Sequence, residues 1–272
     1  LMIISLIGAG ALGLAVIAQR REEEKTEGDE SFGGIDEALT QLGTAGDGES
    51  PRDRAVDVVR KAIGHSVEPS ILVARLPMAI DREKVSHWVD EIVDMVRELQ
   101  ASYPQLDAVR AMSIVDVALS LDTHPYWLAN LINFETNKTF SPSVKHPNSS
   151  AVGLFQFMYS NTPWLLGMKP EGRDDEYTLS QKKASREIFL KMGFIEQMGY
   201  VYDYLNQFQG RLGSQQALYM AVFLPAAMQW PPNKLFPDWA RASNRVETPG
   251  QYVAFLDRHA KIRSPRKNLP LA

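Results

Sequence analysis

The chain lacks cysteine altogether, and this absence excludes a disulfide scaffold, a thiol nucleophile and a thiolate metal site. The five histidines are scattered along the sequence, and none stands in a His-Glu-x-x-His arrangement. A glycine-rich phosphate loop is also missing, because the glycines between residues 28 and 48 lie in a segment with the composition of a spacer. We therefore expect a protein that needs no metal and no other cofactor.

An excess of charge of one sign is lacking as well. The 29 lysines and arginines nearly balance the 33 acidic residues and give a net charge of -4, so we expect no nucleic-acid partner. The basic stretch over residues 261–267 is interpreted as a solvated tail. The hydrophobic fraction of 44% over 272 residues is enough for one core with accessory segments, in one or two domains.

An uncharged apolar run, Leu1 to Ala18, opens the sequence and is followed by Arg20 and Arg21. A run of this length just spans the roughly 30 Å of a bilayer core. Three interpretations are open: a membrane anchor, a cleaved signal peptide with small residues at its cleavage site, and a buried core helix. We take residues 1–20 as a transmembrane anchor or a signal segment, so a membrane is one expected partner.

Composition and periodicity then separate a linker from an accessory helical segment. Residues 21–51 are rich in Glu, Gly, Asp, Ser and Thr, which predicts a flexible linker. Residues 52–119 are predicted to be helical and to pack on the domain that follows, because apolar residues such as Val56, Val59 and Ile63 recur at spacings of three and four. Further helices of this segment are predicted over residues 82–99 and 106–119.

The domain over residues 120–265 is predicted to be mostly α. A helix begins at Pro125, since proline is favoured at the first helical position, and it ends at Glu135. The polar residues 136–150, with their prolines, serines and asparagines, predict a surface loop. Three more helices are predicted over residues 181–209, 214–229 and 249–262. Strand-like alternation is absent, so any sheet is confined to a short hairpin in the loop after Glu135.

Glu135 is the residue in this domain to which the spacing assigns chemistry. Leu128, Leu131 and Ile132 precede it by seven, four and three residues, which places its carboxyl on an apolar helix face. A carboxyl held against hydrophobic groups has its charged form disfavoured, so its pKa rises and it stays protonated near neutral pH. That property suits a glycosidic acid. The alternative is that Glu135 simply ends the helix and points into solvent.

Glu135 and Thr136 are followed by Phe140-Ser141-Pro142 and then by Ala151-Val152-Gly153-Leu154-Phe155-Gln156-Phe157-Met158. This combination resembles the soluble lytic transglycosylase and goose-type lysozyme family. The family pattern is Glu-Ser, an aromatic residue, a proline two residues later, and then a helix that starts with Gly-Leu-Met-Gln. The match covers roughly residues 120–229, under half of the chain, and its specificity lies in the combination. The resemblance implies a lysozyme-like helical domain with a small loop or hairpin subdomain.

The resemblance implies that Glu135 is the catalytic acid and base. It also implies a set of substrate-binding residues, namely Thr136, His146, Gly153, Phe155, Gln156, Tyr219 and Phe223. In this interpretation the missing side chain of Gly153 lets sugar or the catalytic helix approach the backbone closely, and the Gln156 amide suits a sugar hydroxyl or an N-acetyl group. Phe155 stands where the family has methionine and is assigned to sugar contact.

The sequence also departs from the family pattern. Thr136 replaces the usual serine, and His146 falls where the family has a second serine, once two extra residues before Phe140 are counted. The family's Ala-Tyr-Asn-Ala-Gly motif corresponds to residues 221–226, which lack both the tyrosine and the asparagine. Tyr219, one helical turn earlier, is a candidate for the missing hydroxyl, although packing in the core explains it equally well.

By resemblance, the expected substrate is the glycan strand of bacterial peptidoglycan. Glu135 would protonate the oxygen between N-acetylmuramic acid and N-acetylglucosamine and then deprotonate the muramic 6-hydroxyl, which gives a 1,6-anhydro product without a second carboxylate. Two alternatives stay open: a hydrolytic lysozyme with the same glutamate, and an inactive wall-binding or structural protein. The expected location is a membrane-anchored or exported protein facing the cell wall, with a phage virion component as the alternative. Arg20 and Arg21 argue against the first location, because they favour a cytoplasmic position for the chain that follows.

Overall fold

The computed structural model describes residues 50–64, 69, 73, 81–172, 176–244 and 246–262. Within these residues helices dominate and no strand is formed, so the prediction of a mostly-α fold is confirmed. The predicted apolar helix over residues 1–20 lies outside the described residues, as does nearly all of the predicted linker over 21–51. Among the helices that are described, none combines the length and the apolar character needed to cross a bilayer.

The chain divides into two compact units. Unit 1 comprises Leu1–Gln100 with Asp107–Met112, and unit 2 comprises Ala101–Leu106 with Ser113–Ala272. The division therefore falls inside α6 (Ala108–Ser120), a few residues before the boundary at 119 and 120 that composition suggests.

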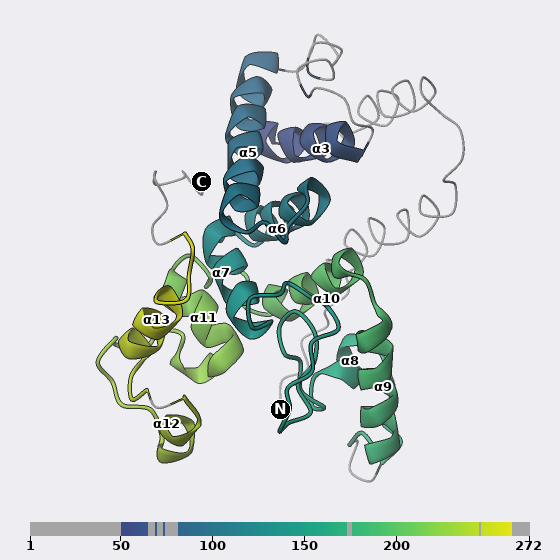
Figure 1. The fold of residues 1–272 in the computed structure, drawn as a ribbon, viewed down its shortest axis with the longest axis vertical. Helices are drawn as coiled ribbons and strands as arrows, with labels where there is room; N and C mark the ends of the chain where they lie inside the picture. Colours follow the sequence, from purple (N-terminus) through teal and green to yellow (C-terminus); the bar gives the residue numbers. More distant parts are fainter. Residues whose placement is uncertain are drawn as a thin grey trace. The chain divides into compact units, whose positions relative to one another are not determined.

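Unit 1 contains α3 (Pro51–Gly64) and α5 (Arg82–Ser102) (Figure 1). The start of each helix is capped by a side-chain oxygen that accepts a hydrogen bond from a backbone N–H three residues later: Ser50 Oγ from Asp53, and Asp81 Oδ1 from Lys84, both at 3.1 Å. The buried residues of α5 recur at the spacing of three and four that predicts this helix, and they are Val85, Val89, Ile92, Met95, Val96 and Leu99.

Unit 2 is built around α7 (Pro125–Glu135), which contacts α11 (Gln215–Phe223) and α13 (Pro249–Asp257). Figure 1 shows this pair on one side of α7, with α10 and the loop after Glu135 on the other. The remaining helices are α8 (Thr162–Leu165), α9 (Leu179–Lys191), α10 (Phe194–Asn206), a 3-10 turn (Pro225–Ala227) and α12 (Asp238–Asn244).

Three of the helices predicted for unit 2 end differently in the structure. The predicted helix over 181–209 is two helices, because Met192 and Gly193 adopt extended backbone and α10 begins at Phe194. The helix predicted over 214–229 stops at Phe223, since Leu224 is extended before Pro225 and proline disfavours a helical residue in front of it. The last helix begins at Pro249 as predicted but ends at Asp257. The short α12 has no counterpart in the prediction.

The predicted bounds of α7 are confirmed at both ends. Pro125 is its first residue, and His124 caps it, because His124 Nδ1 accepts a hydrogen bond of 3.2 Å from the Tyr126 N–H. Its apolar face is fully buried at Leu128, Leu131 and Ile132, each with no exposed surface.

Two asparagines fix α7 against the chain that follows α13. Asn130 Nδ2 donates to the Ile262 carbonyl at 2.9 Å, and Asn133 Nδ2 donates to the His259 carbonyl at 3.3 Å. Both asparagines are buried, where loss of a hydrogen-bond partner costs about 1–3 kcal/mol. The position of Glu135 is therefore set by packing on one face of α7 and by hydrogen bonds on another.

Candidate active site

Glu135 ends α7 with its side chain partly exposed. The surrounding protein removes enough water to raise the pKa of the Glu135 carboxyl from 4.5 to about 8, because desolvation disfavours the charged form. Desolvation is the one cause of this pKa shift. Within the described chain no hydrogen bond or ion pair holds the Glu135 carboxyl, and no charged group shifts its pKa. At neutral pH the carboxyl therefore carries a proton, as the apolar face of α7 predicts.

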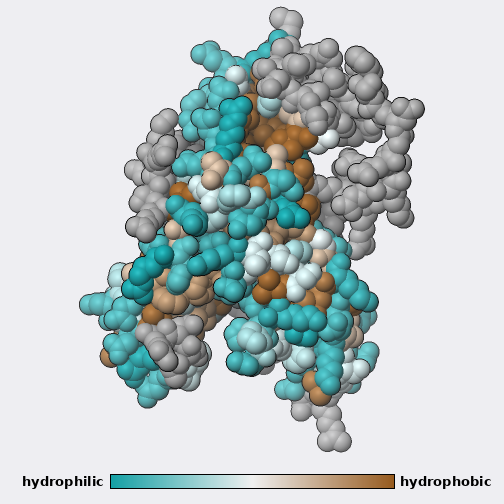
Figure 2. Space-filling view, viewed as in Figure 1, coloured by the Kyte–Doolittle hydropathy of each residue, from teal (hydrophilic) through white to brown (hydrophobic). Residues whose placement is uncertain are grey.

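The surface of unit 2 is hollowed near the end of α7. Figure 2 shows a notch between the part of unit 2 that carries α12 and α13 and the part that carries α8 and α9, with mainly hydrophilic residues over both. In Figure 1, α7 ends between these two parts.

Tyr252 is the neighbour of Glu135 that the sequence did not predict. It lies on α13 and is 2% exposed, and a negative charge on Glu135 helps to raise the pKa of its phenol well above 10, after the larger effect of burial. The Tyr252 ring stacks on Phe223 of α11, with centroids 4.4 Å apart and planes 16° from parallel. Phe223, a predicted substrate-binding residue, is itself partly exposed. Tyr252 thus links the two other helices of the site: its phenol is affected by the charge of Glu135 on α7, and its ring stacks on Phe223 of α11.

Thr136 holds the backbone that follows Glu135. Its side chain has no exposed surface, its hydroxyl donates to the Ile132 carbonyl at 2.7 Å, and the same oxygen accepts from the Phe140 N–H at 3.0 Å. Phe140 is also fully buried, at a positive φ of 52°, and its ring lies 5.1 Å from that of Tyr103. Thr136 thus ties the turn after α7 together, and its side chain does not face a substrate in this structure.

Gly153 is approached by a side chain of α10. A Cβ added to Gly153 would overlap with Oε1 of Gln197, and Gly153 has a φ of +78°, a conformation that side chains disfavour. Gln197 is fully buried: its Oε1 accepts from the Leu154 N–H at 2.9 Å, and its Nε2 donates to the Pro142 carbonyl at 2.8 Å and to the Phe189 carbonyl. The close approach predicted at Gly153 exists, but Gln197 makes it, in place of the sugar or α7.

The stretch from Gly153 to Gln156 is a turn rather than the start of a helix. Gln156 has a φ of 49°, and Val152 forms isolated antiparallel bridges with Lys145 and Phe157. The helix start that the family pattern implies at Gly153 is therefore wrong here, because two positive φ values interrupt it and α8 begins only at Thr162. These bridges are isolated and belong to no strand, so the short hairpin that the sequence allowed does not form a sheet among the described residues.

Gln156 and His146 both lie in this loop. Gln156 is partly exposed, and its Nε2 donates to the Gly153 carbonyl at 3.0 Å. His146 is exposed, and its Nδ1 accepts from the Asn148 N–H at 3.2 Å. Of these two, Gln156 is the one attached directly to the turn that Gln197 fixes.

Phe155 and Tyr219 are part of the core. Phe155 is 2% exposed and Tyr219 has no exposed surface. The Tyr219 hydroxyl accepts from Gln215 Nε2 at 3.2 Å and is hydrogen-bonded to Asn130 of α7, while burial raises the pKa of the phenol. Gln215 Nε2 also donates to Asp257 Oδ1 at 2.7 Å. Tyr219 therefore supports α7 from within the core, in agreement with the packing interpretation of this residue.

Sequence reasoning missed Tyr252 and Gln197 because neither belongs to a local pattern. Tyr252 lies on α13, which packs on α7, and Gln197 lies on α10 and reaches the loop. Both placements depend on tertiary packing. No cluster of histidine and acidic side chains with the geometry of a metal site occurs among the described residues. Comparisons of the chain with protein-family models, with curated proteins and with solved structures found no match, so the family resemblance stays a prediction.

Proposed function

We propose that this chain cleaves the glycan strands of peptidoglycan as a lytic transglycosylase of lysozyme-like fold, with Glu135 as its acid and base. The observation that carries the proposal is the state of Glu135, a partly exposed carboxyl whose pKa of about 8 keeps it protonated at neutral pH. A general acid is most effective when its pKa lies near the working pH. Such a group can give a proton to the oxygen of a glycosidic bond.

The proposed reaction uses the same carboxyl twice. Glu135 donates its proton to the oxygen that links muramic C1 to the next sugar, and the bond between C1 and that oxygen breaks. The resulting carboxylate then takes the proton of the muramic 6-hydroxyl as the hydroxyl oxygen bonds to C1. The products are a 1,6-anhydro end and a free 4-hydroxyl, water is not consumed, and Glu135 is protonated again.

The electrostatics around Glu135 favour this one-carboxylate scheme. Two-carboxylate glycosidases place the second group about 5 to 9.5 Å from the first, where its charge would act on the pKa of the acid. Within the described residues no charged group has that effect on Glu135. The nucleophile is then best supplied by the substrate. Phe223 is proposed to line the site, with Tyr252 buried behind it and Gln156 on the loop as a further polar group.

The experiment is digestion of purified sacculi by the wild-type protein and by Glu135→Gln, with the masses of the released muropeptides recorded. We expect anhydro ends from the wild type, each lighter by one water than a reducing end, and a loss of at least about 10³-fold in rate for the variant. Glu187→Gln is the matched control, because Glu187 is an exposed carboxylate on α9.

Each of the other outcomes has a definite meaning. Reducing ends in place of anhydro ends would show a hydrolytic lysozyme that uses the same acid. Full activity of Glu135→Gln would overturn both enzymatic assignments. A folded wild-type protein without activity on sacculi would favour an inactive wall-binding or structural protein.

A further inference from the structure

The chain that leads into α12 places two large apolar side chains on the surface of unit 2. Leu235 is 58% exposed, and Trp239, in the first turn of α12, is 66% exposed. We call residues 231–239 the α12 tip, and all of them except Phe236 are exposed. Figure 1 shows α12 at the outer end of its part of unit 2, with α11 and α13 between it and α7. A single exposed apolar residue is ordinary, but two on one short stretch indicate a contact surface.

The backbone of the α12 tip is fixed to the start of α13. Phe236 is 2% exposed, its ring centroid lies 5.4 Å from that of Phe223, and its N–H donates to the Glu247 carbonyl at 2.8 Å. The Pro232 carbonyl accepts from the Gly250 N–H at 2.9 Å, and a Cβ added to Gly250 would lie 2.9 Å from the same oxygen. The fold therefore presents the two apolar side chains on a fixed frame.

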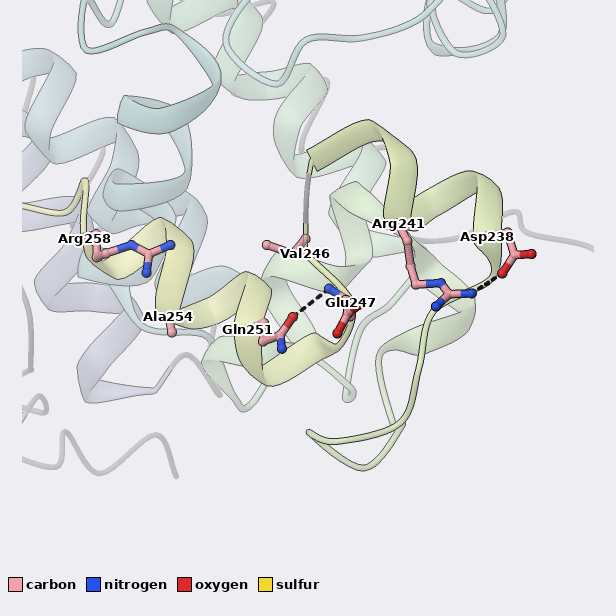
Figure 3. Close-up of a pocket in the computed structure, with 7 residues that line it drawn as sticks. All are labelled: Asp238, Arg241, Val246, Glu247, Gln251, Ala254 and Arg258. Carbon is pink, nitrogen blue, oxygen red and sulfur yellow. Dashed lines mark hydrogen bonds and ion pairs between the residues drawn. The ribbon is translucent and has the colours of Figure 1, made fainter.

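A polar hollow of about 690 Å³ adjoins the α12 tip (Figure 3). Its lining residues come from α12, from α13 and from the chain between these two helices, and they are Asp238, Arg241, Val246, Glu247, Gln251, Ala254 and Arg258. Arg241 pairs with Asp238, which also belongs to the tip. Arg258 and Glu247 are exposed and make no ion pair among the residues that the structure describes. The hollow therefore offers charges of both signs next to an apolar tip.

We propose that the α12 tip docks on the surface of a phospholipid bilayer, with Trp239 and Leu235 in its interfacial layer and the polar hollow facing the headgroups. Tryptophan is enriched at this interface because its ring is apolar and its N–H is polar. A leucine beside it can reach the boundary of the acyl chains. A zwitterionic headgroup carries a phosphate and an ammonium group, which complement the charges of Arg258 and Glu247.

The composition of the α12 tip favours a lipid surface over a glycan. A sugar-binding aromatic ring is accompanied by side chains that donate and accept hydrogen bonds, whereas the other large apolar group of the tip is the aliphatic Leu235. The tip also contains three exposed prolines, Pro231, Pro232 and Pro237. Proline has no backbone N–H, so burial of the tip removes fewer hydrogen-bond donors from water.

The test uses the full chain and reads the α12 tip alone. Because the chain lacks cysteine, Leu235→Cys carries a bimane fluorophore at one position, and iodide in the water quenches an exposed label. We expect vesicles of phosphatidylcholine and phosphatidylethanolamine to shield this label from iodide. The matched control is Leu179→Cys, because Leu179 is 59% exposed but lies on α9, and its label should stay accessible. This control separates docking of the tip from attachment by any other part of the chain.

A second variant tests the role of the Trp239 ring. With Trp239→Ala in the Leu235→Cys background, half-maximal shielding should need at least about 10-fold more lipid, the usual effect of losing one buried large apolar side chain. Ile188→Ala, which removes an exposed apolar side chain from α9, should need no additional lipid. An unchanged lipid requirement for Trp239→Ala would overturn the inference.

Three other results would overturn it as well. Equal responses of the labels at positions 235 and 179 to vesicles would show that the tip is not the contact. Shielding that grows with protein concentration without vesicles would show that a second copy of the chain covers the tip. Shielding by oligomers of N-acetylglucosamine in place of vesicles would show a glycan surface. Docking is independent of the proposed chemistry, so Glu135→Gln should bind vesicles as the wild type does, even if the chain is inactive on sacculi.

Discussion

Replacement of Glu135 by glutamine is expected to stabilise the protein by an amount that grows with pH. Glutamine has nearly the same shape as protonated glutamate, so the packing at the end of α7 is kept. It cannot ionise, however, whereas Glu135 must ionise in a desolvated position at high pH. The group proposed to carry out the chemistry should therefore destabilise the fold, as expected for active-site residues.

The size of this effect follows from the pKa of Glu135. The folded value is about 8 and the ordinary value is 4.5, and each pKa unit corresponds to 1.36 kcal/mol. Below pH 4.5 both states of the chain are protonated there, and wild type and variant differ little. As pH rises to about 8, the unfolded chain loses the proton while the folded protein keeps it, so the wild type loses stability. Above that pH the difference levels off at about 4 to 5 kcal/mol, an upper bound because the side chain is partly exposed.

The measurement is urea unfolding of wild type and Glu135→Gln between pH 4 and 9, with Glu187→Gln as the control. The gap in unfolding free energy between wild type and Glu135→Gln should widen steadily up to about pH 8. A carboxyl carbon NMR titration of Glu135 checks the pKa directly. A gap that stays constant across this pH range would refute the claim that the fold holds Glu135 in its neutral form.

Three further predictions concern the site and its support. First, the rate of sacculus cleavage should fall as pH rises through about 8, because Glu135 loses the proton that it must donate; an unchanged rate at pH 9 would contradict this. Second, Gly153→Ala should lower the unfolding free energy by about 3 kcal/mol through backbone strain and displacement of Gln197. The control Gly213→Ala, whose added Cβ meets no atom within 4 Å, should change the unfolding free energy little. Similar denaturation midpoints for both variants would count against the close approach at Gly153. Third, Tyr252→Phe should keep the stacked ring but lower kcat about 10-fold through loss of a hydroxyl beside the acid, and a wild-type kcat would exclude that role.

Much of the fold of unit 2 could be predicted because its signals are local. Pro125 at the helix start and the buried spacing of Leu128, Leu131 and Ile132 are features of one segment, and α7 has the predicted bounds. Helix ends that depend on neighbouring elements were predicted less well. The break at Gly193 is an example, because the apolar pattern continues across it in sequence while the backbone turns.

The loop after Glu135 was predicted in outline and not in detail. Its turn-forming residues predict a loop, and the described residues there form only isolated bridges and no strand. The conformation at Gly153 and Gln156 depends on Gln197, which reaches this loop from α10. No pattern within the loop indicates which distant side chain fills that space.

From the sequence alone it could be predicted that Glu135 ends an apolar helix, because helical spacing places Leu128, Leu131 and Ile132 on its side of the same segment. Whether its carboxyl is desolvated or points into solvent was left open. The tertiary structure decided which other residues share the site. Tyr252 and Phe223 stack on each other only because α11 and α13 pack together, and both helices pack on the α7 that carries Glu135. Contacts between helices depend on how whole faces pack together, and that information is spread over the chain rather than held in any one motif.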